Sequence, residues 1–452
     1  MLFRSGQAKI ARGPVKRLLT FSVMNGVMYM QPKTAILIGA GDRGARAYAP
    51  YALEYPHELQ IVAVAEPNEI RRYRVTNDHG ISAKNSFATW QEILDSEKIS
   101  DIAIICTQDR FHYEPTIKAL ELGYHVLLEK PMSPDPRECI EMSQAAKKFG
   151  RQLTICHVLR YTEFWSTIQK VIAEGTIGEV ASLQLNENVE IMHMSHSFVR
   201  GNWNNKEKSS PMILQKSCHD MDIINYVMGK KCERVSSYGS LMHFREENAP
   251  KGAPSRCLDG CPAELTCPFH AGRYYLGEGK GWARKFTEDD SREGIIKALN
   301  ETAYGKCVFK SDNNVVDHQV VNMEFEDGAT ATFSMSGFTR DQNRTVQIMG
   351  TKGEIRGSMN DNVISIYDFL TKHETTIKIN QSAGGHGGGD QGIVRSFLRD
   401  IDQQGEGNSK SSASVSLRSH LMAFAAEESR LKHGESIELD TYHEDIMKPL
   451  VK

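Results

Sequence analysis

TAILIGAGDRGARAYAPYALEYPHELQIVAVAE, residues 34–66, is the stretch that decides the fold. Its short apolar run before a glycine-rich turn is typical of a buried parallel strand. Within the turn, we expect Gly39 to allow the sharp bend, Gly41 to let a pyrophosphate approach the backbone, and Gly44 to let the next helix pack closely. The stretch therefore predicts a dinucleotide-binding turn.

A second apolar run ends in Glu66, about 20 residues after the glycine turn. A carboxylate there would accept hydrogen bonds from the adenosine ribose, and it favours NAD over NADP because it would repel a 2′-phosphate. Arg71 and Arg72 follow closely and leave NADP open. The phosphates would lie at the helix N-terminus, beside Asp42 and Arg43. A glycine turn without a ligand is the plainer interpretation, but the strand, helix and acid around the turn favour the dinucleotide.

Length and composition describe a globular protein with more than one core. A chain of 452 residues is too long for one ordinary domain and suggests two. The net charge of −3 favours neither nucleic acid nor an anionic membrane as a partner, and no apolar run is long enough to cross a bilayer. Nine widely spaced cysteines suggest thiols in a reducing compartment, so we expect a cytoplasmic protein.

Residues 1–32 differ from the rest of the chain. They carry basic residues without any acid, followed by an apolar segment, as a signal peptide does. No small-residue cleavage site follows that segment. We therefore expect a disordered leader, or a start placed too early, and exclude these residues from the fold.

Beyond the leader, short apolar strands alternate with helices up to residue 156. This predicts an N-terminal Rossmann domain, a doubly wound parallel sheet over residues 33–156, in an α/β fold. Longer strands with alternating apolar residues follow, so residues 157–440 are predicted to form an α+β domain with a large, open, mostly antiparallel sheet. Residues 244–312 are interpreted as a cysteine-containing insertion, and residues 441–452 as a tail. The open face of the sheet favours a homo-oligomer.

Polar residues gather where the predicted parallel strands end, the edge at which ligands bind in such sheets. Thr107 and His112 follow one strand, and Glu129 and Lys130 follow the next. The ammonium of Lys130 could reach a substrate hydroxyl or a developing alkoxide, and a cis Pro131 would hold a sharp turn beside it. The plainer interpretation of Lys130 is a surface lysine at a strand end.

A second polar group, QKSCHDMD over residues 215–222, opens a predicted helix. His219 and Asp222 lie three positions apart and would share one face of that helix. Histidine suits proton transfer because its ordinary pKa of about 6.5 lies near neutral pH. A histidine whose hydrogen bonds are satisfied at a helix start is the plainer alternative.

These motifs together resemble the Gfo/Idh/MocA oxidoreductases, which include glucose–fructose oxidoreductase and inositol dehydrogenase. The resemblance runs from residue 34 to about 440 and rests on GAGDRG with Glu66, on CTQDRFH, on EKP and on HDMD. It implies that Lys130 contacts the reacting hydroxyl and that His219 is the acid/base. Members commonly carry an aspartate where Gln215 stands, so the ordinary proton relay lacks that charge here. The residues expected to bind the cofactor are Gly39, Gly41, Asp42, Arg43, Gly44, Glu66, Thr107, His112, Glu129 and Lys130.

Two further segments are predicted to line the substrate pocket. Residues 190–203 gather imidazoles, a guanidinium and an indole, which suit a sugar ring, although an exposed polar loop is the alternative. GGHGGGD over residues 384–390 resembles the loop of the family's glycosidase branch, and its glycines suggest close approach to a ligand rather than a flexible linker. The predicted substrate-binding residues are His193, His196, Arg200, Trp203, Gln215, Asp222 and His386.

Cysteines cluster in the insertion. Cys257, Cys261 and Cys267 lie within a short segment beside glycine and proline, and Cys307 follows later. This arrangement suggests a structural zinc or iron–sulfur site, although the usual CxxC spacing is absent and free thiols are the alternative.

We therefore predict an NAD(P)-dependent dehydrogenase that moves a hydride between nicotinamide and the hydroxyl-bearing carbon of a sugar, polyol or glycoside. Two alternatives are kept. The first is a glycoside hydrolase that oxidises and later reduces its substrate with no net use of NAD, with His386 and His193 as additional bases. The second is a regulator that binds the dinucleotide without catalysis, which the presence of Lys130 and His219 disfavours.

Overall fold

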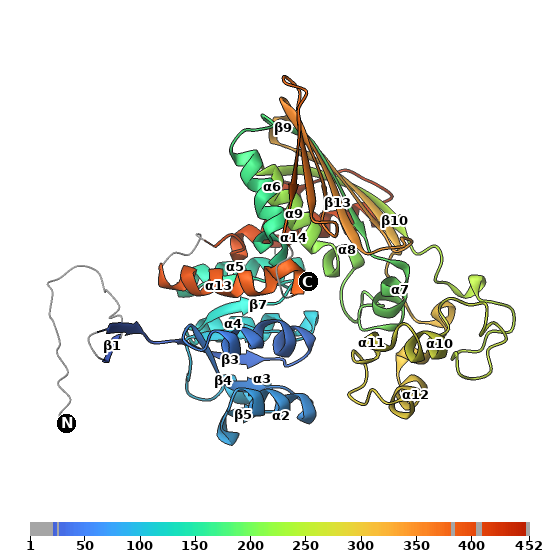
Figure 1. Cartoon of the computed structure of the whole chain (residues 1–452), viewed down its shortest axis with the longest axis horizontal. Coiled ribbons are helices and arrows are strands. Elements are labelled where there is room, and N and C mark those ends of the chain that lie inside the picture. Colours follow the sequence, from blue (N-terminus) through green and yellow to red (C-terminus); the bar gives the residue numbers. More distant parts are fainter. Residues whose placement is uncertain (1–20, 25–26, 381–384, 404–408, 449–452) are drawn as a thin grey trace.

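The computed structural model describes residues 21–24, 27–380, 385–403 and 409–448. In this part of the chain, two large sheets lie one beyond the other, with helices packed around each (Figure 1). None of the described helices is long and apolar enough to cross a membrane.

The first sheet is parallel and has six strands in the order β5-β4-β3-β6-β7-β8. Its central strands are buried on both faces, as a doubly wound sheet requires, so the predicted Rossmann domain is confirmed. The strands are β3 Lys33–Ile38, β4 Leu59–Ala65, β5 Ser86–Phe87, β6 Ile102–Ile105, β7 His125–Leu128 and β8 Leu153–Ile155.

Helices connect these strands. The first begins as a wide π-type turn, η1 Asp42–Tyr48, and continues as α1 Ala49–Glu54. Pro50 lies in the first turn of α1, where a missing N–H costs little, so it does not break the segment. The others are α2 Glu69–Asp78, α3 Trp90–Leu94, α4 Tyr113–Glu121 and α5 Pro136–Phe149.

The second sheet has nine strands in the order β16-β15-β14-β13-β9-β12-β11-β10-β17. Only the pairing of β9 with β12 is parallel, which confirms the predicted mostly antiparallel sheet. The long strands are β9 Val180–Asn188, β10 Cys232–Ser240, β11 His318–Phe325, β12 Thr330–Ser336, β13 Asn343–Gly350, β14 Gly353–Ser358, β15 Val363–Asp368 and β16 Glu374–Lys378, with β17 Ile437–Glu438 at the edge.

Burial alternates along these strands, because one face packs on helices and the other faces solvent. The packing helices are α6 Glu163–Ala173, α9 Cys218–Met228 and α14 Ala413–Leu431, with α15 Leu439–Met447 beside β10. Short helices α7 Ile191–His193 and α8 Met212–Gln215 connect β9 to α9. This sequence of elements places the start of α9 at the boundary between the two sheets (Figure 1).

Helix α13, Gly389–Asp402, returns to the first domain. Its apolar residues Ile393, Val394 and Phe397 are buried in the same core as strand β3, although they lie far beyond residue 156. The core of the N-terminal domain is therefore completed by a helix from outside residues 33–156.

The interval between β10 and β11 contains the predicted insertion. It holds α10 Ala271–Leu276, α11 Lys280–Ala283 and α12 Arg292–Glu301, which share a small core of their own. In Figure 1 these helices lie beside the parallel sheet, on the side of its α2 helix. The predicted leader differs from expectation in one part, because β1 Phe21–Met24 pairs with β2 Val27–Met30; residues 1–20 lie outside the described residues.

Candidate active site

The three glycines of the first turn have distinct structural roles. Gly39 has a φ of +90°, and a Cβ there would lie 2.6 Å from the carbonyl oxygen of Cys106. A Cβ on Gly44 would lie 2.1 Å from the carbonyl oxygen of Gly39, so only glycine lets the helix approach the strand. A Cβ on Gly41 would meet nothing within 4 Å. That open space beside a helix N-terminus suits a pyrophosphate, so the residues present fit a dinucleotide.

These contacts predict opposite outcomes for two similar substitutions. Gly39→Ala is expected to destabilise the fold by at least about 1–3 kcal/mol, because alanine would be strained at a positive φ and would clash with Cys106. Gly41→Ala should leave the unfolding free energy within about 0.5 kcal/mol of wild type. It should weaken NAD binding by about tenfold or more, since its methyl group enters the space for the pyrophosphate.

Urea unfolding and NAD titration of both variants provide the test. If Gly41→Ala bound NAD as tightly as wild type, the pyrophosphate would not lie at this turn.

Glu66 is buried at the end of β4, where the adenosine ribose is expected. Its carboxylate accepts hydrogen bonds from the backbone N–H of Ala40 at 2.7 Å and of Asn68 at 2.9 Å. The two nearby arginines are engaged elsewhere: Arg72 donates to the backbone carbonyl of Glu66, and Arg71 pairs with Glu288. Neither guanidinium is therefore directed at a 2′-phosphate position.

Arg43 connects the glycine turn to α13 through Asp390. Its guanidinium donates to Glu129 Oε1 at 2.5 Å, to the Tyr48 hydroxyl at 2.6 Å, and to Asp390 Oδ1 at 2.7 Å. Burial alone would raise the pKa of Glu129, but the positive charges of Arg43 and Lys130 outweigh it and lower the pKa. Arg43 and Glu129, both predicted to bind the cofactor, instead form a buried ion pair that fixes the loop behind it.

His112 was also expected at the cofactor, and its contacts correct that expectation. Its ring is buried, with Nδ1 2.7 Å from the carbonyl oxygen of Pro131 and Nε2 3.1 Å from that of Thr107. Both nitrogens face carbonyl groups of strand-end loops, and a neutral imidazole can donate to only one of them. The Thr107 hydroxyl donates to the carbonyl of Phe111 and can still accept a hydrogen bond.

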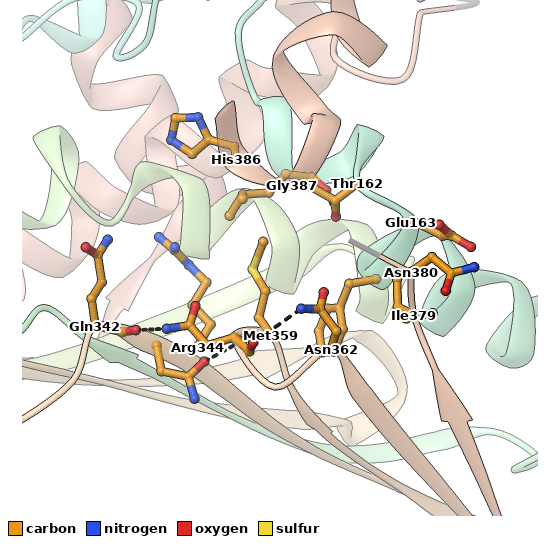
Figure 2. Close-up of a pocket in the computed structure, with 14 residues that line it drawn as sticks. Thr162, Glu163, Gln342, Arg344, Met359, Asn362, Ile379, Asn380, His386 and Gly387 are labelled. Carbon is orange, nitrogen blue, oxygen red and sulfur yellow. Dashed lines mark hydrogen bonds between the residues drawn. The ribbon is translucent and has the colours of Figure 1, made fainter. Parts of the chain in front are cut away.

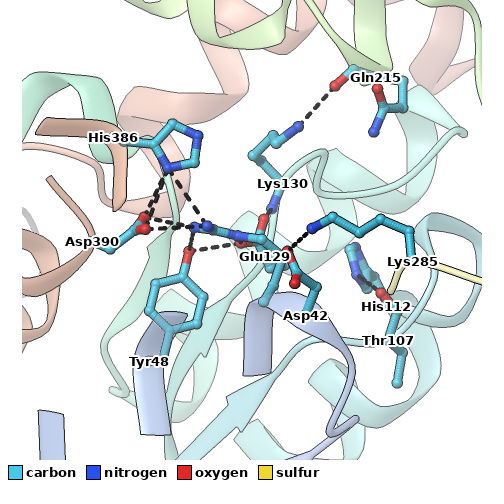
Figure 3. Close-up of polar contacts among 11 residues, drawn as sticks. Asp42, Tyr48, Thr107, His112, Glu129, Lys130, Gln215, Lys285, His386 and Asp390 are labelled. Carbon is cyan, nitrogen blue, oxygen red and sulfur yellow. Dashed lines mark hydrogen bonds and ion pairs between the residues drawn. The ribbon is translucent and has the colours of Figure 1, made fainter. Parts of the chain in front are cut away.

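The insertion reaches the cofactor domain at two points. Lys285 pairs with Asp42 in the glycine turn at 2.6 Å (Figure 3), and Glu288 pairs with Arg71 and with Arg74 on α2. Asp42 therefore attaches the insertion to the glycine turn. No local sequence signal indicated these contacts.

Lys130 lies at the C-terminal edge of the parallel sheet, as predicted. The bond between Lys130 and Pro131 is cis. Nζ of Lys130 donates to the backbone carbonyl of Gln215 at 2.9 Å (Figure 3). Gln215 thus contacts Lys130 through its backbone carbonyl. Its side chain is an uncharged carboxamide at the position where members of the resembled family commonly carry an aspartate.

His219 lies in the first turn of α9 and is buried. Burial, together with the nearby charges of Lys130 and His157, lowers its pKa well below the ordinary value. The imidazole is therefore neutral at neutral pH, and its Nδ1 has no hydrogen-bond partner among the described residues. A neutral, unpartnered ring nitrogen beside an ammonium is suited to accept a proton.

Two further histidines lie behind His219 and were not predicted. The ring of His157 packs 5.9 Å from that of His219 and 5.4 Å from that of His420. His420 accepts a hydrogen bond from the backbone N–H of Met132 and contacts the carbonyl of Ser416 at 2.7 Å, so it is neutral and fixed. This buried stack holds the ring of His219 in place.

Asp222, which was predicted to contact the substrate, is engaged with the protein itself. It is buried and receives two hydrogen bonds from Arg160, at 2.6 and 2.8 Å. The neighbouring Asp220, which was not predicted, pairs with Arg344 of β13 at 2.7 Å. Arg344 also pairs with Glu187, which in turn binds Lys216, so a chain of four buried charges supports the start of α9.

His386 lies in the glycine loop, within η10 Gly385–Gly388, and has a φ of +51°. Its Nδ1 lies 3.1 Å from Asp390 Oδ1, and its ring lies 6.0 Å from that of His219. Burial opposes ionisation of Asp390, but its contacts with His386 and Arg43 hold its pKa well below the ordinary value. The contact with Asp390 orients the imidazole of His386 near that of His219. The sequence had predicted His386 as a substrate-binding residue.

The segment of residues 190–203 is only partly at the site. His193 packs 5.1 Å from Trp282 of the insertion, and burial lowers its pKa to about 3. His196 bonds the hydroxyl of Tyr275 at 2.7 Å, and Arg200 donates to the carbonyls of Lys306 and Phe269.

His196 and Arg200, which were predicted to bind the substrate, are buried and attach the insertion. The ring of Trp203 packs 6.1 Å from that of Phe198, and its indole nitrogen is buried. Of this segment, only His193 remains a candidate for substrate contact.

The cysteine cluster is also corrected. All nine cysteines are free, and no group of three or more His, Cys, Asp or Glu residues in the described part of the chain is arranged to hold a metal ion. Sγ of Cys257 contacts Arg200 at 3.6 Å, while burial raises the pKa of Cys267 and of Cys307. Cys261 is a partly buried member of the same packing.

Comparison with known proteins agrees with this geometry. Residues 33–157 match the oxidoreductase family with an NAD-binding Rossmann fold, and residues 169–429 match the C-terminal alpha/beta domain of the same family. The chain belongs to the Gfo/Idh/MocA oxidoreductase family. Its N-terminal unit is thus the NAD-binding domain of that family.

Within the family, the chain is similar to several proteins. It is 26% identical to the putative oxidoreductase YteT of Bacillus subtilis over 64% of this chain and 70% of that one. It is 29% identical to D-glucoside 3-dehydrogenase of Escherichia coli over 35% of this chain and 44% of that one. A solved structure of levoglucosan dehydrogenase with NADH and L-sorbose has the same fold, with a TM-score of 0.68, 19% identity, and coverage of 91% of this chain and 99% of that one.

Proposed function

We propose that this oxidoreductase removes a hydride from a hydroxyl-bearing carbon of a neutral sugar, polyol or glycoside. The observation that carries the proposal is the position of Lys130, which follows strand β7 of the parallel sheet and whose charge is among those that lower the pKa of the buried His219 and keep its imidazole neutral. NAD bound at that turn would accept the hydride. The similarity to a D-glucoside 3-dehydrogenase supports a carbohydrate as the substrate.

Lys130 and His219 have separate roles in the proposed reaction. The ammonium of Lys130 donates a hydrogen bond to the substrate hydroxyl and stabilises the negative charge that develops on its oxygen. The imidazole of His219 accepts the hydroxyl proton, which its neutral state permits. The ion pairs of Arg43 and of Arg344 keep both groups oriented from behind.

A substrate screen tests this function. Protein supplied with NAD is mixed with a panel of sugars, polyols and methyl glycosides, and NADH is followed by its absorbance. Absence of NADH formation with every member of the panel, at sites shown to be filled with NAD, would contradict the proposal.

We expect NAD to bind more tightly than NADP by about tenfold or more. Glu66 would repel a 2′-phosphate, and neither Arg71 nor Arg72 is free to bind one. Titration of both cofactors measures the ratio. Glu66→Gln removes the charge with little change of shape and should reduce the ratio, whereas equal affinities in the wild type would show that the crevice accepts the phosphate.

A second candidate is cleavage of a glycoside with no net consumption of NAD. The His386–Asp390 pair beside His219 favours it, because removing a second proton, from the carbon next to the oxidised one, requires a further base. An aryl glycoside in deuterated water separates the two. Many turnovers with solvent deuterium incorporated at the carbon next to the oxidised one would support cleavage, and a keto-sugar formed together with NADH would support dehydrogenation.

We also propose that the enzyme is a cytoplasmic homo-oligomer. Nine free thiols fit a reducing compartment. Tyr238 and Val320, paired across β10 and β11, are 55% and 39% exposed on the uncovered sheet face, which offers a self-complementary surface.

A further inference from the structure

A cavity of about 640 Å³ opens beside His386, on the side away from the parallel sheet. Its walls are the start of α6, the segments at the start of β13 and the end of β14 in the second sheet, and the glycine loop (Figure 2). Such a volume is typical of a small-molecule site. It exceeds the space that a single hexose ring occupies.

Carboxamides dominate the polar part of this cavity. Each carboxamide offers a donor and an acceptor, which matches the hydroxyl groups of a sugar. Some are held by the backbone: Asn343 accepts from the N–H of Asn360 at 2.9 Å, and Asn362 donates to the carbonyl of Asn360 at 3.2 Å. The carboxamides that line the cavity are Gln342, Asn343, Asn360, Asn362 and Asn380.

The charges around the cavity favour a neutral ligand. Arg344 lies in its wall, but its guanidinium is held by Asp220 and Glu187, both at 2.7 Å. Glu163 is exposed at the rim. With the one buried cation already neutralised by two carboxylates, the wall has no charge to offer a phosphate or a carboxylate group.

Apolar side chains complete the wall. Phe164 and Met359 line the cavity together with Ile379. A pyranose ring presents hydroxyls at its rim and C–H groups on its faces, so a wall that combines carboxamides with apolar side chains matches both. A linear apolar ligand would exclude water from the carboxamides without offering them new hydrogen bonds, which is costly.

The cavity adjoins the candidate catalytic centre through His386. His386 lines it, and the ring of His386 lies 6.0 Å from that of His219. We infer that this cavity binds the second sugar unit of a neutral glycoside, so that the substrate is a disaccharide or longer oligosaccharide. This inference rests on the proposed function, since it assumes that a sugar ring is oxidised at His219.

Binding to the NAD-loaded protein tests the inference without requiring turnover. Maltose, cellobiose and lactose are titrated calorimetrically against methyl α-glucoside, methyl β-glucoside and methyl β-galactoside. We expect at least one disaccharide to bind about tenfold more tightly than its methyl glycoside, because each added hydrogen bond in the cavity contributes modestly. Equal or weaker binding of all three disaccharides would overturn the inference.

A variant locates the extra affinity. Asn362 has a φ of +54°, so Asn362→Gly removes the carboxamide while glycine keeps the backbone. The disaccharide should bind about threefold or more weakly, with the methyl glycoside unchanged. Lys372→Gly is the matched control, because Lys372 also has a positive φ, of +57°, but is exposed at the β15–β16 turn.

Loss of both affinities to the same extent in Asn362→Gly would place the second sugar elsewhere and overturn the inference. Tight disaccharide binding without any NADH formation would contradict the proposed function while supporting the cavity as a sugar site.

Discussion

Replacing Lys130 by alanine is expected to lower the rate of NADH formation by about two to four orders of magnitude, while NAD still binds. The ammonium is the only charged donor placed at the reacting hydroxyl in the proposed geometry, and its hydrogen bond to the carbonyl of Gln215 fixes its position. Alanine removes the stabilisation of the developing oxyanion, which is needed in the transition state more than in the bound substrate.

The measurement is steady-state NADH formation together with NAD titration. Lys147→Ala, at an exposed lysine in the last turn of α5, is the control and should match the wild type. A Lys130→Ala enzyme that keeps more than about a tenth of the wild-type rate would show that this ammonium does not take part in the chemical step.

His219→Gln should have a similarly large effect, about two to four orders of magnitude on kcat. Glutamine keeps the polarity and much of the volume of histidine but cannot accept the proton. The pH dependence provides a second readout. Because the pKa of His219 is lowered well below its ordinary value, the base stays neutral, and the rate should fall only when the pH drops well below 6.5.

The control here is His373→Gln, at an exposed histidine before β16. The acid limb assigned to His219 should disappear in His219→Gln, leaving a slow rate with little dependence on acid pH. If the wild-type rate fell with an apparent pKa near 6.5, or if His219→Gln kept the same acid limb, another group would be the base.

The fold could be predicted from the sequence because several local patterns indicate the same architecture. The glycine turn, the acid after the second strand and the alternation of strands with helices all require the same parallel sheet, and the alternating strands after residue 180 require a half-exposed one. Helix α13 could not be assigned to the first domain in this way. Its apolar face shows that it packs, but not against which sheet.

The candidate site was predictable where the backbone conformation determined the residue. Gly39, Gly44, Glu66 and Lys130 occupy positions that the turn and the strand ends define. His196, Arg200 and Asp222 were assigned to the substrate by their chemistry alone. The same polar groups suit buried contacts equally well, and only tertiary structure shows that their partners are Tyr275, backbone carbonyls and Arg160.

The site residues that were not predicted have partners that lie far away in the sequence. Arg344 joins Asp220 and Glu187 over more than a hundred positions, and Lys285 reaches back to Asp42. No spacing rule connects such residues. Asp390 is the exception, since it follows His386 by one helical turn and the GGHGGGD motif itself contained the pair.

Transfer of a carbon-bound deuterium to the cofactor tests the central claim most directly. Protein filled with stoichiometric NAD is incubated once with carbon-deuterated sugars and glycosides, quenched, and its cofactor is analysed by mass spectrometry. We predict reduced cofactor that carries one deuterium from the substrate, and none with Lys130→Ala on the same timescale. Cofactor that stays oxidised and unlabelled with every carbohydrate would contradict the assignment of this protein as a carbohydrate oxidoreductase.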